Sequence, residues 1–195
     1  AGVLHNRSVE LAKKFRVDLE VLSSLERKPG TKVKEVTKVE KTTIAGVAKD
    51  TSIARIALIG LRHNPGVAFQ VFDLLSKHNI NVDIILQSIG REDTKDISFT
   101  VARDDVAEVE KILEANRTRL TFEKLETDTT VAKVSVVGAG MQSNAGVAGM
   151  MFEALYNVGV NIRMIATSEI RITVLIDEAD VDTATKAVHD KFIED

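Results

Sequence analysis

The sequence predicts an α+β protein made of two βαββαβ modules, with the first module inserted in the second. Three observations support this prediction: a long internal repeat within the 195 residues, the same order of strands and helices in both copies, and a spare strand upstream of the first copy. A repeat of this kind is one supersecondary unit, so two copies indicate two structural modules.

The repeat aligns two segments without a gap at a shift of 80 residues. Gly60-Leu-Arg-His-Asn-Pro-Gly-Val-Ala68 lies over Gly140-Met-Gln-Ser-Asn-Ala-Gly-Val-Ala148. Further along, the offset falls to 75, where Ile97–Val101 matches Ile172–Ile176. The difference between the two offsets falls in an expected turn at Gly90–Lys95, and turns tolerate such changes in length.

Both copies predict the same series of elements. An apolar strand runs into a polar loop that contains Asn64 or Asn144, and asparagine is a favourable N-cap residue for the helix that follows. The apolar residues of that helix recur at helical spacing. Taken pairwise from the two copies, the expected elements are a strand (Arg55–Ile59; Val134–Val137), a helix (Gly66–His78; Gly146–Val158), a strand (Val82–Leu86; Ile162–Ala166), a strand (Ile97–Val101; Ile172–Ile176) and a helix (Asp104–Asn116; Asp180–Phe192).

The fourth strand distinguishes the two copies. The first copy adds a strand near Leu120–Leu125, whereas the second copy ends after its helix. A sheet that lacks this edge would leave apolar helix surface uncovered, so we predict that a spare strand at Thr42–Ala48 completes the second module. The predicted division is residues 1–40 as the edge of another domain with a linker, 50–128 as the inserted module, and 41–49 with 129–195 as the second module.

Residues 1–40 differ from both copies. They predict a short helix at Ser8–Phe15, a strand at Val17–Leu22 and a connector rich in Lys and Glu at Lys28–Glu40. One helix and one strand cannot bury a core alone. We therefore interpret this part as the edge of a larger domain.

Composition and charge exclude several classes of function. The net charge of −3, with acidic and basic residues mixed, is unlike the basic surface of a nucleic-acid-binding protein. The absence of Cys excludes disulfides, thiolate metal sites and cysteine nucleophiles. No stretch approaches the ~20 apolar residues that span a bilayer, so we expect a cytoplasmic protein that binds neither membrane nor nucleic acid. His5, His78 and His189 lack a carboxylate at ligand spacing, so we expect no metal site.

The repeated loop between the first strand and the first helix is the candidate binding site. A helix N-terminus favours an anion, and Gly66 or Gly146 lets a ligand approach the backbone. We expect Asn81-Val-Asp83 and Asn161-Ile-Arg163 to face these loops across the sheet edge. A zwitterionic amino acid would suit the first site, with its carboxylate at the helix and its ammonium at the side-chain oxygens of the facing segment. A capped turn without a ligand remains the alternative.

These residues resemble a known family. The segments His63-Asn-Pro-Gly-Val-Ala68 and Asn81-Val-Asp-Ile-Ile-Leu-Gln-Ser88 resemble an ACT domain. Gly138–Ala148 with Asn161–Ile170 is similar to the C-terminal regulatory module of aspartate kinase, and Gly2–Ala12 is similar to the last segment of the kinase domain of that family. The resemblance therefore covers nearly the whole chain.

The resemblance implies two ferredoxin-like ACT modules, the first inserted in the second, after the C-terminal edge of a kinase domain. It implies regulation of aspartate kinase, with lysine and/or threonine bound for feedback inhibition of aspartate-family amino-acid biosynthesis. The chain is then expected to lack the catalytic domain and to be inactive alone. It would have no catalytic residue, metal or cofactor of its own, because ATP and Mg belong to the missing kinase domain. Expected partners are a kinase domain or catalytic subunit and a second copy, which forms a homodimer through the ACT modules.

The effector positions of the family carry over residue by residue. Arg163 stands at the position that corresponds to Asp83, so we do not expect the two modules to hold one ligand in the same way. The implied effector positions are His63, Pro65, Gly66, Val67, Ala68, Asn81, Val82, Asp83 and Gln87 in the first module, and Val147, Ala148, Asn161, Ile162, Thr167 and Ser168 in the second.

Three alternatives remain open at this point: an ACT module of another amino-acid enzyme, an RNA-binding protein and a small hydrolase. RNA-recognition domains share the βαββαβ order but carry aromatic residues and a basic pattern on the central strands. The matching strand here is Ile97-Ser-Phe-Thr-Val101. A hydrolase would need a positioned nucleophile or an Arg-lined phosphate loop, and the sequence shows neither.

Overall fold

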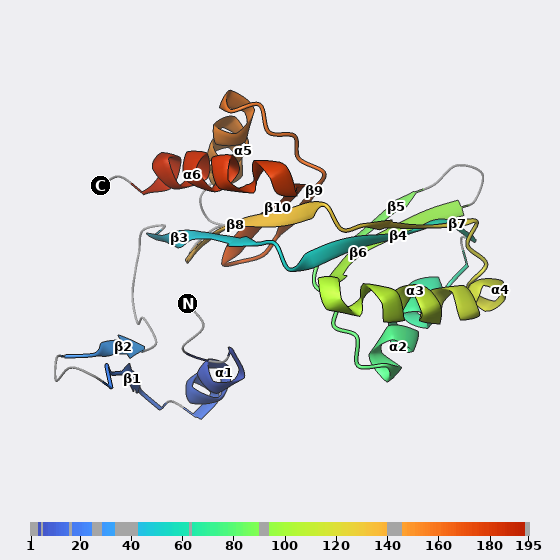
Figure 1. Cartoon of the computed structure of the whole chain (residues 1–195), viewed down its shortest axis with the longest axis horizontal. Helices are drawn as coiled ribbons and strands as arrows, with labels where there is room; N and C mark the ends of the chain where they lie inside the picture. Colours follow the sequence, from blue (N-terminus) through green and yellow to red (C-terminus); the bar gives the residue numbers. More distant parts are fainter. Residues whose placement is uncertain are drawn as a thin grey trace. The chain divides into compact units, whose positions relative to one another are not determined.

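The computed structural model of the chain describes residues 4, 6–15, 17–24, 29–33, 43–62, 64–89, 94–139 and 146–193. The chain divides into two compact units, Ala1–Glu40 and Lys41–Asp195 (Figure 1). The first unit contains α1 (Asn6–Phe15) and an antiparallel pair of short strands, β1 (Leu19–Val21) and β2 (Thr31–Val33). The strand β2 lies in the segment that we expected to be a connector. Thr31 and Val33 are β-branched, and such residues favour strands. The strand β1 supplies the partner for pairing.

The first module of the second unit has a four-stranded antiparallel sheet in the order β5-β6-β4-β7. The strand expected near Leu120–Leu125 begins later, because Leu120 ends a short helix and only the residues from Lys124 onward pair with β4. The elements of this module are β4 (Ile53–Arg62), α2 (Val67–Lys77), β5 (Ile85–Ile89), β6 (Thr94–Ala102), α3 (Val106–Ala115), α4 (Arg117–Leu120) and β7 (Lys124–Asp128).

The second module has a four-stranded sheet in the order β3-β8-β10-β9. Its edge strand β3 precedes the whole first module in the chain and pairs antiparallel with β8, where Val47 lies opposite Val136. The chain therefore leaves the second sheet after β3, builds the first module and returns through β8. The elements are β3 (Thr43–Asp50), β8 (Val131–Ala139), α5 (Val147–Asn157), β9 (Met164–Thr167), β10 (Arg171–Asp177) and α6 (Val181–Phe192).

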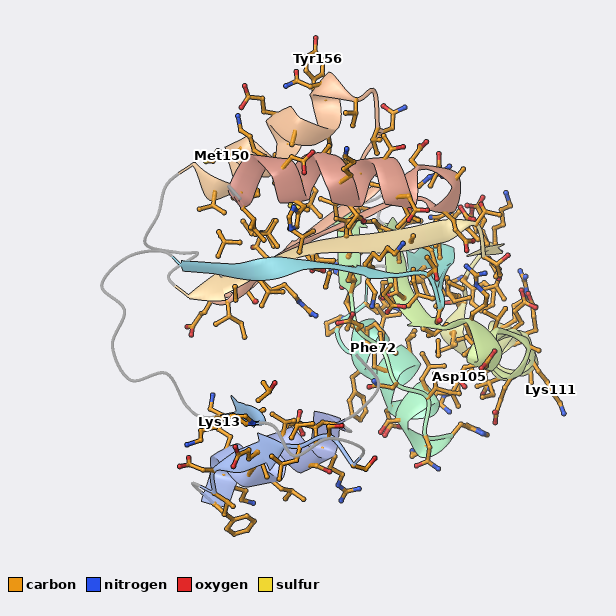
Figure 2. All side chains as sticks on the ribbon, turned by 60° about the vertical axis from the view of Figure 1, so that its left-hand side comes forward. Lys13, Phe72, Asp105, Lys111, Met150 and Tyr156 are labelled. Carbon is orange, nitrogen blue, oxygen red and sulfur yellow. The ribbon has the colours of Figure 1, made fainter. Side chains whose placement is uncertain are left out.

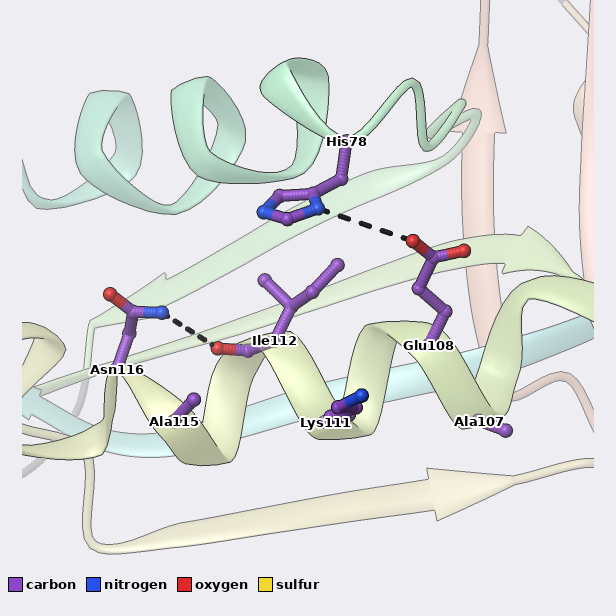
Figure 3. Close-up of a pocket in the computed structure, with 7 residues that line it drawn as sticks. All are labelled: His78, Ala107, Glu108, Lys111, Ile112, Ala115 and Asn116. Atoms are coloured by element: carbon purple, nitrogen blue, oxygen red, sulfur yellow. Dashed lines mark hydrogen bonds and ion pairs between the residues drawn. The ribbon is translucent and has the colours of Figure 1, made fainter.

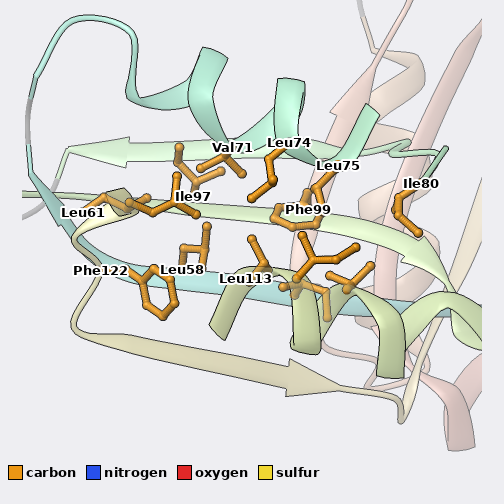
Figure 4. Packing of buried hydrophobic residues seen from close by; sticks show 14 of the residues in the cluster. Leu58, Leu61, Val71, Leu74, Leu75, Ile80, Ile97, Phe99, Leu113 and Phe122 are labelled. Carbon is orange, nitrogen blue, oxygen red and sulfur yellow. The ribbon is translucent and has the colours of Figure 1, made fainter. Parts of the chain in front are cut away.

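Helices cover one face of each sheet, which confirms the predicted α+β class. In the first module, Val71 and Leu75 from α2 and Leu113 from α3 meet Leu58 and Phe99 from the strands, and all five side chains are fully buried (Figure 4). The second module repeats this packing. Its buried core includes Val136 and Val174 from the strands, Met151 and Leu155 from α5, and Ala184 and Val188 from α6. The helical spacing of the apolar residues therefore places one stripe of each helix against its sheet.

A third apolar cluster joins the two modules. It consists of Ile53 and Ile84 from the first module and Val131, Met164 and Leu175 from the second, all of them buried. We call these five residues the junction cluster. Ile84 and Met164 occupy corresponding positions in the repeat, just before or at the start of the edge strands β5 and β9. Each module therefore places the beginning of its edge strand against the other module.

Two short links cross this junction. Thr51-Ser52 joins β3 to β4, and Thr129-Thr130 joins β7 to β8. Each link follows an aspartate whose Oδ1 accepts a backbone N–H: Asp50 from Ser52 and Asp128 from Thr130, both at 2.9 Å. Aspartate favours such local turns because its side chain binds the backbone two residues on. Both links are therefore ordered turns.

We predict that the buried core of the second module contributes strongly to the stability of the protein. Replacing the fully buried Leu155 by Ala should lower the free energy of unfolding by about 2–5 kcal/mol, because the change removes apolar contacts and leaves a cavity. Ile165→Ala is the matched control, since this side chain is 46% exposed. Urea denaturation measures both losses, and equal losses would contradict the observed packing.

Candidate functional site

The loop before α2 presents open backbone. The N-cap of α2 is Gly66, with φ of 88°, and no side chain caps this end. Asn64 was the expected N-cap, which is wrong: its carbonyl oxygen instead accepts the Val67 N–H at 3.4 Å across the Pro65-Gly66 turn. A side chain at Gly66 would have no heavy atom within 4 Å of its Cβ. A ligand can therefore approach the backbone at this helix end.

The second module has the same helix start. Gly146 is the N-cap of α5, with φ of 112°, and it too has open space around the Cβ position. Positive φ favours glycine, which explains why both copies keep it at this position. The expected cap Asn144 and the candidate residue His63 lie outside the described residues.

Asn81–Asp83 lies at the other end of the first sheet from this loop. The loop follows Arg62, which pairs with Thr94, whereas the Asp83 N–H donates to the Thr100 carbonyl oxygen at 3.1 Å. Ile89 lies six positions after Asp83, which corresponds to about 20 Å along a strand. The expectation that this segment faces the loop is therefore wrong within one module. We call the two ends of each sheet the loop end and the junction end.

The candidate positions divide between these two ends. Gln87 lies on β5 toward the loop end, together with Pro65, Gly66 and the start of α2. In the second module, the Ser168 N–H donates to the Arg171 carbonyl oxygen at 2.8 Å, and Gly138 donates to Ile170 nearby. Positions of the loop end are Pro65, Gly66, Val67, Ala68, Gln87, Val147, Ala148, Thr167 and Ser168. Positions of the junction end are Asn81, Val82, Asp83, Asn161 and Ile162.

Several candidate side chains belong to the cores. Val67 and Val147 are buried, and Val82 and Ile162 pack against the apolar clusters of their modules. The side chains of these four residues are apolar, so the only polar groups that they can offer a ligand belong to the backbone. The exposed polar side chains of the set include those of Asn81, Asp83 and Gln87 in the first module and Asn161, Thr167 and Ser168 in the second.

Asp83 binds two cations of the second module. Its Oδ2 lies 2.7 Å from Lys133 Nζ, and its Oδ1 lies 3.5 Å from Arg171 Nη2. Lys133 also lies 3.2 Å from Asp50 Oδ2. Partial burial acts to raise the pKa of Asp83, but the Lys133 hydrogen bond and the charges of Lys133 and Arg171 outweigh it and hold this pKa below its ordinary value. These partners could not be read from the sequence, because they are 50 and 88 residues away.

Arg163, at the corresponding position, makes the reciprocal contact with the first module. It pairs with Asp177 of its own module and lies 3.6 Å from Asp128 Oδ2 at the end of β7. Arg103 of the first module adds a further ion pair, 2.8 Å from Glu178 Oε2. The opposite charges of Asp83 and Arg163 therefore have a structural role, since each meets an opposite charge across the junction.

A surface groove of about 600 Å³ lies away from these positions, along α3 and the end of α2 (Figure 3). Ile112, Ala107 and Ala115 are among its lining residues, and His78 Nδ1 lies 4.0 Å from Glu108 Oε1 at one end. None of its lining residues is a candidate effector position. Within the described ranges, no group of His, Asp or Glu side chains could hold a metal ion, and no helix is long and apolar enough to cross a membrane.

The contact between Asp83 and Lys133 makes a prediction about pH. Asp83→Asn should lower the free energy of unfolding at neutral pH by less than about 1 kcal/mol, because partly exposed ion pairs contribute little. The pKa of Asp83 in the folded state lies below its ordinary value of 3.8. The parent therefore exceeds the variant in free energy of unfolding by the full amount above pH 3.8, and this difference is lost as the pH falls through the lowered pKa. Urea denaturation of both proteins over this range measures the difference, and a difference independent of pH would contradict the prediction.

Comparison with known proteins agrees with this arrangement. The ACT domain family matches residues 56–116 and 134–192, which cover most of each module and leave out β3, α4 and β7. Aspartokinase 2 of Bacillus subtilis is 42% identical over 193 residues. The match covers 98% of this chain and 47% of that protein, so the chain spans about half the length of the curated relatives it matches.

Solved structures show the same likeness. The regulatory subunit of aspartate kinase from Thermus thermophilus, in its ligand-free form, is 38% identical with a TM-score of 0.74, over 77% of this chain and 99% of that chain. Aspartokinase III of E. coli, in complex with lysine and aspartate, shares the fold at 23% identity and a TM-score of 0.72, over 98% of this chain and 42% of that one. The chain therefore belongs to the ACT domain family, among the regulatory regions of aspartate kinases.

Proposed function

We propose that this region binds lysine and/or threonine between two copies of the chain and thereby inhibits an aspartate kinase. The observation that supports this proposal most directly is the division of the candidate site between the two ends of an edge strand. The helix N-terminus and Gln87 lie at the loop end, while Asn81 and Asp83 lie at the junction end. One module alone therefore does not bring the two halves of an amino-acid site together.

An antiparallel pairing of two β5 strands would unite these halves. In the sheet, β5 pairs with β6 alone among the described strands, so its other edge is free. Ile85 and Leu86 on this strand are 52% and 46% exposed, which is typical of a surface that a partner covers. In a twofold dimer the strands run in opposite directions, so the loop end of one copy would meet the junction end of the other.

The chemistry of such a joint suits a zwitterion. The ligand carboxylate would bind the N-terminus of α2 beside Gly66, where free N–H groups and the helix dipole favour an anion. The ligand ammonium would bind Asn81 and Asp83 of the second copy. Gln87, exposed on the same strand, would supply a further polar contact from the loop end.

The second module offers a weaker version of this site. Its edge strand β9 also carries exposed apolar side chains, with Ile165 on the strand and Ile170 in the turn after it. Tyr156 and Met150 point away from the core on α5 (Figure 2). Arg163 stands where the first module has Asp83, so an ammonium would meet a cation there. We therefore propose the first module as the amino-acid site and the second as a further pairing surface.

We assign no catalytic step to this region of the protein. In the relatives, this region corresponds to about half of a longer aspartokinase, or to a separate regulatory subunit. We propose that a kinase domain or catalytic subunit, with its ATP and Mg, is the partner that the bound amino acid inhibits. Inhibition requires that the ligand bind the inactive state of that assembly more tightly than the active state.

The proposal predicts a specific pattern of affinities in calorimetric titrations with L-lysine and L-threonine. Asp83→Ala should weaken binding about 10- to 100-fold, since a charge-assisted hydrogen bond is worth about 1.5–3 kcal/mol. Arg163→Ala is the matched control, because it removes the corresponding junction contact from the other side and should change the affinity little.

Thermal melts of both variants separate binding from folding. If both variants lose stability and neither loses affinity, Asp83 is a structural residue and the proposed site is wrong. The E. coli structure holds lysine, so lysine is the first amino acid to test.

A further inference from the structure

We propose that Asp83 exchanges Arg171 of the second module for the ammonium of the ligand, so that ligand binding loosens one side of the junction between the modules. This inference rests on the proposed function, because it needs a ligand ammonium at Asp83. It adds a way in which ligand binding to the first module changes the contacts between the two modules.

The exchange follows from what already surrounds the carboxylate. One oxygen of Asp83 binds Lys133 at 2.7 Å, and the other faces Arg171 at 3.5 Å. A ligand ammonium would add a third positive charge beside these two, and like charges at this distance repel one another. The weakest of the three contacts should give way, and that is the longer contact to Arg171.

Neither cation is left buried without a partner when the ligand ammonium binds. The Lys133 side chain is only 12% exposed, so losing all of its partners would leave a largely buried charge, which is costly. Asp50 Oδ2 lies 3.2 Å from the same Nζ and can hold it. The Arg171 side chain is 46% exposed, so water can solvate it when it leaves. The exchange is therefore possible without an unpaired buried charge.

The rest of the junction should stay in place. Ile84, next to Asp83, remains buried against Leu175 and Met164 in the junction cluster. Arg163 with Asp128 and Arg103 with Glu178 hold the other contacts across it. Loss of the contact between Asp83 and Arg171 alone would therefore let the modules turn about the junction cluster without separating.

The first test is calorimetry with L-lysine and L-threonine on the full chain. If Arg171 competes with the ligand ammonium, Arg171→Gln should bind about two- to fivefold more tightly, which corresponds to the contribution of one exposed ion pair. Arg103→Gln is the control, since it breaks a junction ion pair that touches no candidate position, and it should leave the affinity unchanged. Thermal melts are expected to show similar, small losses of stability for both variants.

The outcomes separate this inference from the proposed function. If the parent binds neither amino acid, the proposed function fails and the inference fails with it. If the parent binds and Asp83→Asn weakens binding, but Arg171→Gln binds no more tightly than Arg103→Gln, the inference alone is overturned. Tighter binding by both arginine variants would also overturn it, because it would indicate general loosening of the junction.

A distance measurement tests the conformational part directly. The chain has no Cys, so spin labels can be placed at Lys111→Cys on α3 and Lys186→Cys on α6, two exposed positions in different modules. Lysine or threonine, whichever the parent binds, should shift or broaden the distance distribution in the parent and should leave it unchanged in Asp83→Asn at the same ligand concentration. An unchanged distribution in the parent at saturation would contradict the loosening of the junction.

Discussion

The backbone ladder between β3 and β8 is the constraint on which the arrangement of the two modules depends. It places a strand that precedes the first module into the sheet of the second, so the first module begins and ends at the same place. The two links at that place, Thr51-Ser52 and Thr129-Thr130, are ordered turns of two residues. With so little chain between them, the modules must lie against each other, and the junction cluster fills the contact.

The repeat and this contact together explain the charges at corresponding positions. Each edge strand begins at the junction, so Asp83 and Arg163 both face the other module. Identical charges would not suit both neighbours, because Asp83 meets Lys133 while Arg163 meets Asp128. The difference between the two copies, from which we expected that they do not hold one ligand in the same way, thus also has a cause in the packing. A residue that serves both the junction and a ligand can connect the two, which is the physical basis of our inference about Asp83.

Much of the fold could be predicted from the sequence, because the repeat and the apolar periodicity determine the elements and their order. The missing fourth strand of the second copy indicated that an upstream strand closes that sheet, and β3 pairs there with β8. The strand β2 and the short helix α4 were missed, since short elements have too few residues to show a period. Gly66 was recognised as important, but its role as the N-cap was assigned to Asn64, because positive φ cannot be read from residue type alone.

The candidate residues stay a prediction, but the expectation that Asn81–Asp83 faces the loop before α2 within one module is wrong. The reason was available in the sequence: in a strand-helix-strand unit with parallel strands, the loop after the first strand and the start of the second strand lie at opposite ends of the sheet. The ion pairs at Asp83 could not be predicted, because they depend on how the modules pack.

A subunit-mixing experiment tests the two-copy site most directly. Gly66→Asp places a carboxylate where the ligand carboxylate would bind, and Asp83→Ala removes the ammonium partner. The φ of 88° at Gly66 strains any side chain, so a thermal melt must first show that Gly66→Asp folds. Each variant alone should bind lysine and threonine at least about 10-fold more weakly than the parent in calorimetry. A mixture of equal amounts should recover about a quarter of the parent's sites, because half of the dimers are mixed and each mixed twofold dimer has one intact site. A mixture that binds no better than the separate variants would contradict a site shared between two copies.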